Sequence, residues 1–319
     1  MSSVCKTTGT VLAALLAIAT VAALCPGITH AADLNIPPDA QKALDAIYSG
    51  DAQQGAVLAH AFEQAEPQNP LGYLIEDEAL WWQRYCEACE VKWGIVETWK
   101  HDKQSNDEAY LAQADEAIVL AQARLAKNDS ADMHFYAGMA YALKVRMYGL
   151  RGENRAAARA GVAARSEMLE ALKLDPQMAD ATAAMGIYNY YVDTLSPMLK
   201  FFRFLSGIPG GDKEEGVRQM EVGMADGKLL AIDVRFILAA ALRRYDRKYE
   251  KAISVAQPLV TQYPRNPTFL LLVGNLNMEL GRDDSAQGYF HAVEQLSPAS
   301  PCVAHSQELA RSYAAGARR

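Results

Sequence analysis

The sequence predicts an all-α fold, a superhelix (solenoid) of about five to six helix pairs with irregular insertions. Half of the 319 residues are apolar and only 8% are aromatic, and helix-forming residues such as Ala, Leu, Glu, Gln and Arg dominate. Long β-branched runs with a period of two are missing, which argues against a sheet. Pro264 and Pro298 lie 34 residues apart, a length typical of one repeated helix pair.

The segment 267–298 has the residue pattern of one such pair. Gly274, Gly281 and Ala286 are its small residues, and Phe290 supplies an aromatic ring. Small residues let two antiparallel helices approach closely, and the aromatic ring fills the space between them. We therefore expect stacked helix pairs whose contacts depend on glycine and alanine.

Residues 1–31 have the features of a signal peptide. Lys6 gives a positive start, residues 11–24 are apolar, and residues 29–31 fit a small-x-small cleavage site. We expect cleavage and a periplasmic or secreted protein. The alternative is retention at the inner membrane by an uncleaved signal, although the apolar run is short for a bilayer span. Cys25 leaves lipidation open, but a bulky leucine precedes it.

The charge of the chain argues against two classes of partner. The formal net charge is −7, and loss of Lys6 with the signal peptide makes it one unit more negative. A negative protein is repelled by nucleic acid and by anionic membrane surfaces. We expect no nucleic acid partner, and membrane contact only through residues 195–206.

A glycine separates the first two helices of the mature chain. A flexible lead-in is expected at 33–38 and a short helix at 40–48, which Gly50 ends. Asp51 is placed to cap a second helix that continues to residue 65.

The next two helices are separated by an irregular stretch. A helix at 71–85 ends in a cluster of apolar and aromatic residues. The stretch 87–105 mixes tryptophans with charges and is expected to be an irregular excursion. An amphipathic helix then follows at 107–126.

Three cysteines follow the signal peptide: Cys86, Cys89 and Cys302. In an oxidising compartment two of them would tend to form a disulfide. The Cys-x-x-Cys spacing favours a local structural bridge between Cys86 and Cys89, with free thiols, a redox motif or a metal half-site as alternatives. Cys302 could also be the partner of either one.

The repeat pattern is clearest in the second half of the chain. Gly138, Ala164, Ala171 and Gly186 occupy the positions where small residues are expected. The clearest units span residues 131–176, 179–225, 233–266 and 267–300, within a repeat domain at 32–319. A terminal helix at 302–316 is expected to cap the last exposed face.

Residues 195–211 interrupt the repeat pattern. Ser196 and Pro197 resemble a helix start, and a short, very apolar helix at 198–205 follows. Asp212 then caps a helix that begins at Lys213. The apolar helix could fill the concave face of the superhelix as a plug, which we favour, or form a lip for a partner or a membrane.

These units resemble the tetratricopeptide repeat (TPR) superfamily, best over residues 131–298. The block at 186–191, 195–202 and 211–216 is similar to uncharacterised exported bacterial TPR proteins and to eukaryotic TPR proteins of the family numbered thirty-nine. This resemblance implies no catalytic residues. The turn at 209–212 also resembles helical T components of TRAP transporters.

The TPR resemblance implies a groove that binds a peptide or a helix of a partner, lined by the first helix of each pair. The candidate contacts in this groove are Tyr141, Tyr188, Tyr190 and Asn275. Phe201 and Phe204, in the apolar interruption, are further candidates.

Catalytic, cofactor and metal signatures are missing from the sequence. The histidines are scattered, so each is expected to be a surface or packed residue. The neighbouring carboxylates Glu76 and Asp77 are expected to lie on an exposed, solvated helix face.

The sequence therefore favours a non-enzymatic scaffold that binds a protein or peptide partner in the bacterial cell envelope. The alternative is a transport accessory protein, similar to the TRAP T component. It would bind a solute-binding partner or a small ligand in a helical cavity around residues 188–204.

Overall fold

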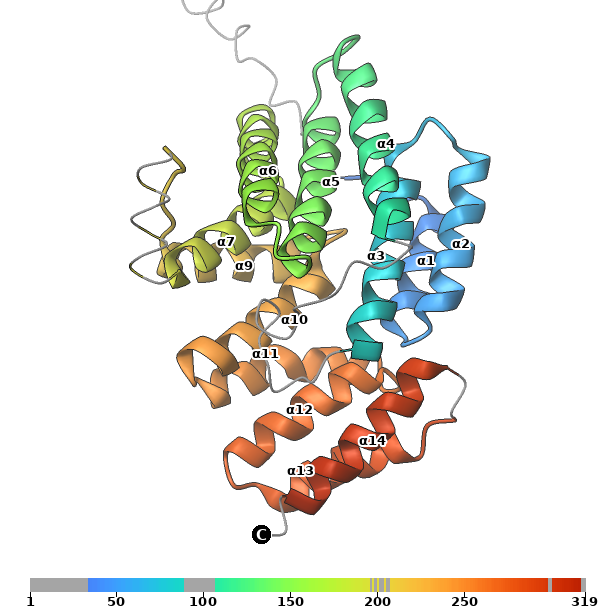
Figure 1. The fold of residues 1–319 in the computed structure, drawn as a ribbon, viewed down its shortest axis with the longest axis vertical. Helices are drawn as coiled ribbons and strands as arrows, with labels where there is room; N and C mark the ends of the chain where they lie inside the picture. The colour runs from blue at the N-terminus through green and yellow to red at the C-terminus, as the bar shows by residue number, and fades with distance from the viewer. Residues whose placement is uncertain are drawn as a thin grey trace, which may run out of the picture. The chain divides into compact units, whose positions relative to one another are not determined.

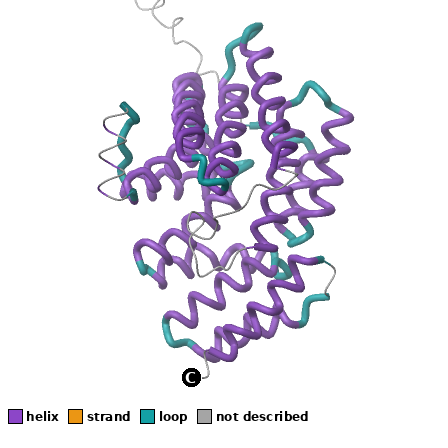
Figure 2. The backbone as a smooth tube through the Cα atoms, in the orientation of Figure 1, coloured by secondary structure: helices purple, strands orange, loops and turns teal. Residues whose placement is uncertain are grey.

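A computed structural model describes residues 34–88, 107–195, 197, 200, 204, 207–297 and 300–316. The elements formed by these residues are helices, and the described chain contains no strand, which confirms the all-α prediction (Figures 1 and 2). The expected signal peptide (1–31), most of the expected excursion, Cys89, Phe201 and Pro298 lie outside the described residues. Within the described residues, no helix combines the length and apolarity needed to cross a bilayer.

The helices follow the predicted order closely. Those of the first half are α1 (Pro38–Tyr48), α2 (Ala52–Ala65), α3 (Pro70–Ala88), α4 (Asp107–Leu125), α5 (Ala131–Leu150) and α6 (Asn154–Leu174). Those of the second half are α7 (Ala179–Thr194), α9 (Lys213–Asp226), α10 (Ala231–Ala241), α11 (Tyr249–Gln262), α12 (Pro267–Glu279), α13 (Asp283–Glu294) and α14 (Pro301–Gly316). Each helix packs mainly against its neighbours in sequence.

Side-chain caps fix several of the helix starts. Asp51 accepts a hydrogen bond from the backbone N–H of Gln54 (3.0 Å), and Asp212 accepts one from Glu215 (2.9 Å). Both caps were predicted from the sequence. Asn266 caps α12 in the same way, directly before Pro267. These caps satisfy N–H groups that have no partner within the helix.

Glycines allow the closest helix contacts. A Cβ atom on Gly186 of α7 would lie 2.7 Å from the carbonyl oxygen of Gly216 on α9. A Cβ on Gly274 of α12 would lie 2.6 Å from the ring of Phe290 on α13. Any larger residue would push these pairs apart, so the packing expected from the small residues is confirmed at both places.

A short π-helical turn, Leu242–Asp246, extends α10 and was not expected. Arg247 ends it in the left-handed region, with a φ of 52°. The wider turn places Tyr245 and Asp246 beside Tyr190 of α7, which links the two helix pairs.

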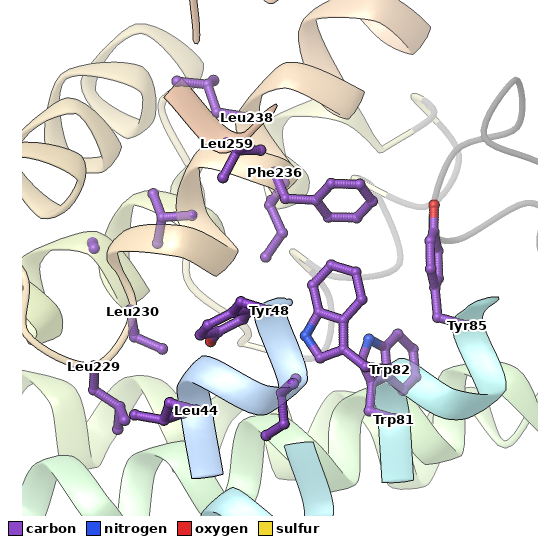
Figure 3. Close-up of a cluster of buried hydrophobic side chains, with 14 of the residues drawn as sticks. Leu44, Tyr48, Trp81, Trp82, Tyr85, Leu229, Leu230, Phe236, Leu238 and Leu259 are labelled. Atoms are coloured by element: carbon purple, nitrogen blue, oxygen red, sulfur yellow. The ribbon is translucent and has the colours of Figure 1, made fainter. Parts of the chain in front are cut away.

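Helix α3 is central to the unit formed by residues 33–319, because it packs against α1, α2, α4, α5 and α14. Its Trp82 ring lies 5.0 Å from Phe236 of α10 and 5.7 Å from Phe269 of α12, measured between centroids. Tyr48 of α1 meets the same tryptophan edge-on at 6.2 Å (Figure 3). Residues from α1 and α3 therefore cover the faces of α10 and α12 that carry these rings.

A disulfide joins the beginning and the end of the helical array, between Cys86 of α3 and Cys302 of α14. The sequence favoured a local bridge between Cys86 and Cys89. That prediction was wrong, because Cys86 is bonded to Cys302 instead. The Cys-x-x-Cys spacing suggested Cys89 as the partner, whereas the packing of α14 on α3 brings Cys302 to Cys86. Asn266 reinforces this closure by donating a hydrogen bond to the Tyr48 carbonyl (2.9 Å).

Candidate functional site

Tyr188 is half-buried on α7 and anchors the loop that precedes α9. Its hydroxyl donates a hydrogen bond to the Pro209 carbonyl (2.9 Å), and the Arg165 guanidinium of α6 lies over its ring at 5.6 Å. Tyr141 of α5 is also half-buried, against the core. Both side chains keep some exposed surface, so their role in partner contact stays a prediction.

Tyr190 and Asn275 are buried instead of lining an open surface. The Tyr190 hydroxyl bonds Asp246 (3.2 Å), and Lys213 pairs with the same carboxylate. Burial, followed by the charge of Asp246, raises the pKa of Tyr190. Asn275 accepts a hydrogen bond from the Arg243 guanidinium. In this conformation the two predicted contact residues hold helices together and offer no surface to a partner.

Phe204 is the most exposed of the large apolar side chains that the structure describes, with 75% of its surface accessible. This exposure contradicts the favoured interpretation of the apolar segment as a plug, at least for Phe204. The lip interpretation suits it better, because a bulky ring in water contributes no packing to the fold. Phe201 lies outside the described residues.

Polar contacts hold both ends of the segment that carries Phe204. Asp193 at the end of α7 pairs with Lys200 (2.8 Å) and accepts the backbone N–H of Lys213 (3.4 Å). The hydrogen bond from Lys200 is the main reason that the pKa of Asp193 is lowered. Gly211 lies so close to the Asn189 carbonyl that no Cβ would fit there. These contacts join the end of α7 to Lys200 and to the start of α9.

A buried ionisable network surrounds α3 and was not foreseen. Glu78 pairs with Arg146 of α5 (2.6 Å), and its carboxyl group also contacts Asp233 of α10. Asp233 accepts hydrogen bonds from the Tyr48 hydroxyl and from the Trp82 indole N–H, the latter at 3.2 Å. Burial, and then the charge of Glu78, raises the pKa of Asp233 well above its usual range.

Asp77 continues this network, and its surroundings correct the prediction of a solvated carboxylate. Its side chain is fully buried, and neither carboxyl oxygen has a hydrogen-bond partner in the described structure. Burial raises its pKa well above the ordinary value. Nearby, Arg84 pairs with the buried Asp107 (3.0 Å). The apolar residues around Asp77 in the sequence were the only signal for this burial.

The network joins helices in the interior of the described structure. Asp77, Glu78 and Asp233 are all buried. Beside the disulfide lies a hollow of about 10 Å³, lined by Trp82, Asn266 and both bridging cysteines among others. This volume suits about one water molecule and is far smaller than a ligand pocket.

A separate group of polar residues on α2 and α3 has the composition of a metal site. His60, Glu63 and Glu76 each offer one ligand atom, and these three atoms lie within 4.8 Å of one another. Burial, followed by a hydrogen bond with Glu76, raises the pKa of Glu63. His60 itself is exposed, as the sequence analysis expected of a surface histidine.

A search of protein-family models finds no match to this chain, and no curated protein is significantly similar to it.

Proposed function

We propose that this chain is an exported, TPR-like scaffold that binds a protein or peptide partner in the bacterial cell envelope and catalyses no reaction. The observation that carries the proposal is Phe204, an exposed aromatic ring on a segment with fixed ends. Aromatic side chains supply much of the binding energy at protein interfaces, because they bury a large area at a small cost in conformational entropy.

Most of the exposed large apolar side chains that the structure describes lie in the same part of the chain as Phe204. Five of the seven large ones in the described chain belong to α6, α9 and the connection before α9: Val162, Leu169, Leu174, Phe204 and Val222. Val162 and Leu169 lie seven residues apart and so share one face of α6. Exposed large apolar side chains are frequent at binding sites.

The disulfide supports the exported location. Structural disulfides persist in oxidising compartments and are rare in the bacterial cytosol. The bridge between Cys86 and Cys302 therefore agrees with a protein that passes through a secretion pathway.

The rival function, a transport accessory protein with a small ligand between its helices, has less support. The Tyr190 ring packs against Tyr191 at 5.6 Å and Tyr245 at 6.4 Å, so side chains fill the space beside it. A solute-binding protein as the partner would still fit the surface around Phe204. Identification of the partner distinguishes these possibilities.

Photo-crosslinking tests the proposal directly. A photoreactive phenylalanine analogue is placed at Phe204 in the exported protein, and in a second variant at Val119 of α4, which is also exposed. We expect a discrete adduct from position 204 in intact cells and none from position 119. Mass spectrometry of the adduct identifies the partner.

Binding to the purified partner then completes the test. F204A should weaken binding by at least roughly tenfold, as expected for an interface anchor, whereas V119A should leave it unchanged. The absence of an adduct from position 204, or equal affinity of F204A and wild type, would contradict the proposal.

A further inference from the structure

His60, Glu63 and Glu76 come together because of the spacing of residues on two adjacent helices. His60 and Glu63 are three residues apart on α2, so both project from the same face. Glu76 reaches them from the facing side of α3, and its Oε2 atom lies 3.2 Å from His60 Nδ1. The group combines imidazole and carboxylate donors, as zinc sites in proteins do.

The distances agree with one shared ion. Zinc lies about 2.0–2.2 Å from nitrogen and carboxylate ligands, so two ligands of a tetrahedral zinc are roughly 3.3 Å apart. The separation between His60 Nδ1 and Glu76 Oε2, 3.2 Å, matches this spacing. The three ligand atoms all lie within 4.8 Å of one another, so Glu63 is close to the same position.

Neighbouring amides orient the three side chains. Gln113 of α4 donates hydrogen bonds to Glu63 (3.2 Å) and Glu76 (2.9 Å). The Gln64 side chain lies 2.9 Å from His60 Nε2, which leaves Nδ1 directed at Glu76. Partners of this kind fix the orientation of metal ligands and strengthen binding.

The backbone and the local charge also suit a cation. Gly72 lets α3 approach α2 at Glu63, since a Cβ there would lie 2.9 Å from the Glu63 Cα atom. Glu116 adds a third carboxylate to the surroundings of Tyr73, together with Glu63 and Glu76. A negative surface of this kind attracts a divalent cation.

We infer that His60, Glu63 and Glu76 form a zinc site that joins α2 to α3 and leaves one coordination position open to water. About half of the His60 side chain is exposed, so an ion can reach the site from solvent. The inference is independent of the partner interface, because its residues lie on other helices.

Titration of the mature, untagged protein with Zn²⁺ tests the site. After treatment with a chelator and with the disulfide intact, we expect one equivalent to bind in isothermal titration calorimetry. Binding should also raise the melting temperature, because a ligand that prefers the folded state stabilises it. H60A and E76Q should each weaken zinc binding by more than about tenfold. Removing only a residue that hydrogen-bonds a metal ligand already costs about tenfold or more, and these variants remove a ligand itself.

His134 provides a matched control, because it also has two carboxylate neighbours. Its Nδ1 atom lies 2.6 Å from Glu167 and its Nε2 atom 2.9 Å from Asp129, so these oxygens lie on opposite sides of the ring. They cannot converge on one ion, and H134A should bind zinc as the wild type does. Unchanged zinc affinity in H60A and E76Q, or less than one equivalent in the wild type, would overturn the inference.

Discussion

The helical unit contains two regions that are stabilised in different ways. Where α1 and α3 meet α10, α12 and α14, aromatic rings, hydrogen bonds to the buried Asp233 and a disulfide join residues far apart in the sequence. From α5 to α9, neighbouring helices are held by close contacts at Gly138, Gly186 and Gly216, and apolar side chains remain on the surface. We call these the closed region and the open region.

The two regions differ in how much apolar surface remains for the proposed partner. In the proposed TPR-like arrangement the first helices of the pairs would face a groove, but Phe236 of α10 and Phe269 of α12 face Trp82 of the same chain. In the closed region, α1 and α3 of the same chain cover the faces of α10 and α12 that carry these rings. The open region retains unburied apolar surface, and the proposed interface at Phe204 belongs to it.

The largest expected effect contrasts Trp82 with Phe204. W82A should lower the free energy of unfolding by about 3–5 kcal/mol, because it removes a buried ring that contacts three helices. F204A should change it by less than about 0.5 kcal/mol, because the ring is exposed. Urea unfolding of the oxidised proteins measures both. Similar losses in the two variants would mean that Phe204 is packed and that the regions do not differ as described.

Local features of the fold were predictable from the sequence. Glycine and proline mark where helices stop and start, and Asp51 and Asp212 stand where a side chain can cap the next turn. The contact between Gly274 and Phe290 also followed from the pattern, because residues of one helix pair are close in sequence.

Long-range features were not predictable, because periodicity shows that a face is buried without showing what covers it. Trp82 was recognised as part of an apolar cluster, but nothing in the sequence indicated Phe236 or Phe269 as its neighbours. The pairing of Cys86 with Cys302 depends on the same closure. Tyr190 was assigned to a groove because it lies on the first helix of an expected repeat. The π-helical turn whose Asp246 bonds it leaves no clear sequence signal.

The zinc candidate was missed for a related reason. His60 and Glu63 show the i, i+3 spacing of residues on one helix face, which was the available signal. Glu76 belongs to the next helix, and its approach depends on the close contact at Gly72. Three ligands from two helices can be recognised only when the packing of those helices is known.

A smaller effect tests the glycine contacts of the open region. G186A should lower the free energy of unfolding by about 1–3 kcal/mol, because the new methyl group would overlap backbone atoms of Gly216 and Met220. Gly288 of α13 is the matched control, since a Cβ there meets nothing within 4 Å. G288A should stabilise the protein by up to about 1 kcal/mol through helix propensity. Destabilisation by both substitutions would show that the loss at Gly186 is not caused by its close contact.

The smallest effect concerns pH and the contact between α5 and α6. Burial alone would lower the pKa of His134, but its hydrogen bonds to Glu167 and Asp129 raise it overall. The folded protein therefore holds this proton more tightly than the unfolded chain, so the stabilisation is complete below the ordinary value of 6.5. This stabilisation is lost as the pH rises above 6.5 and passes through the raised pKa of His134 in the folded state.

Substitution of the histidine isolates this contribution. The difference in unfolding free energy between wild type and H134A should be largest below pH 6.5 and should decrease at higher pH. Solvent screening should keep the pH-dependent part below about 1 kcal/mol, because the pair lies near the surface. A difference that grows with pH would mean that His134 is stabilised in its neutral form, and its carboxylate contacts would then not hold α5 and α6 together as an ion pair.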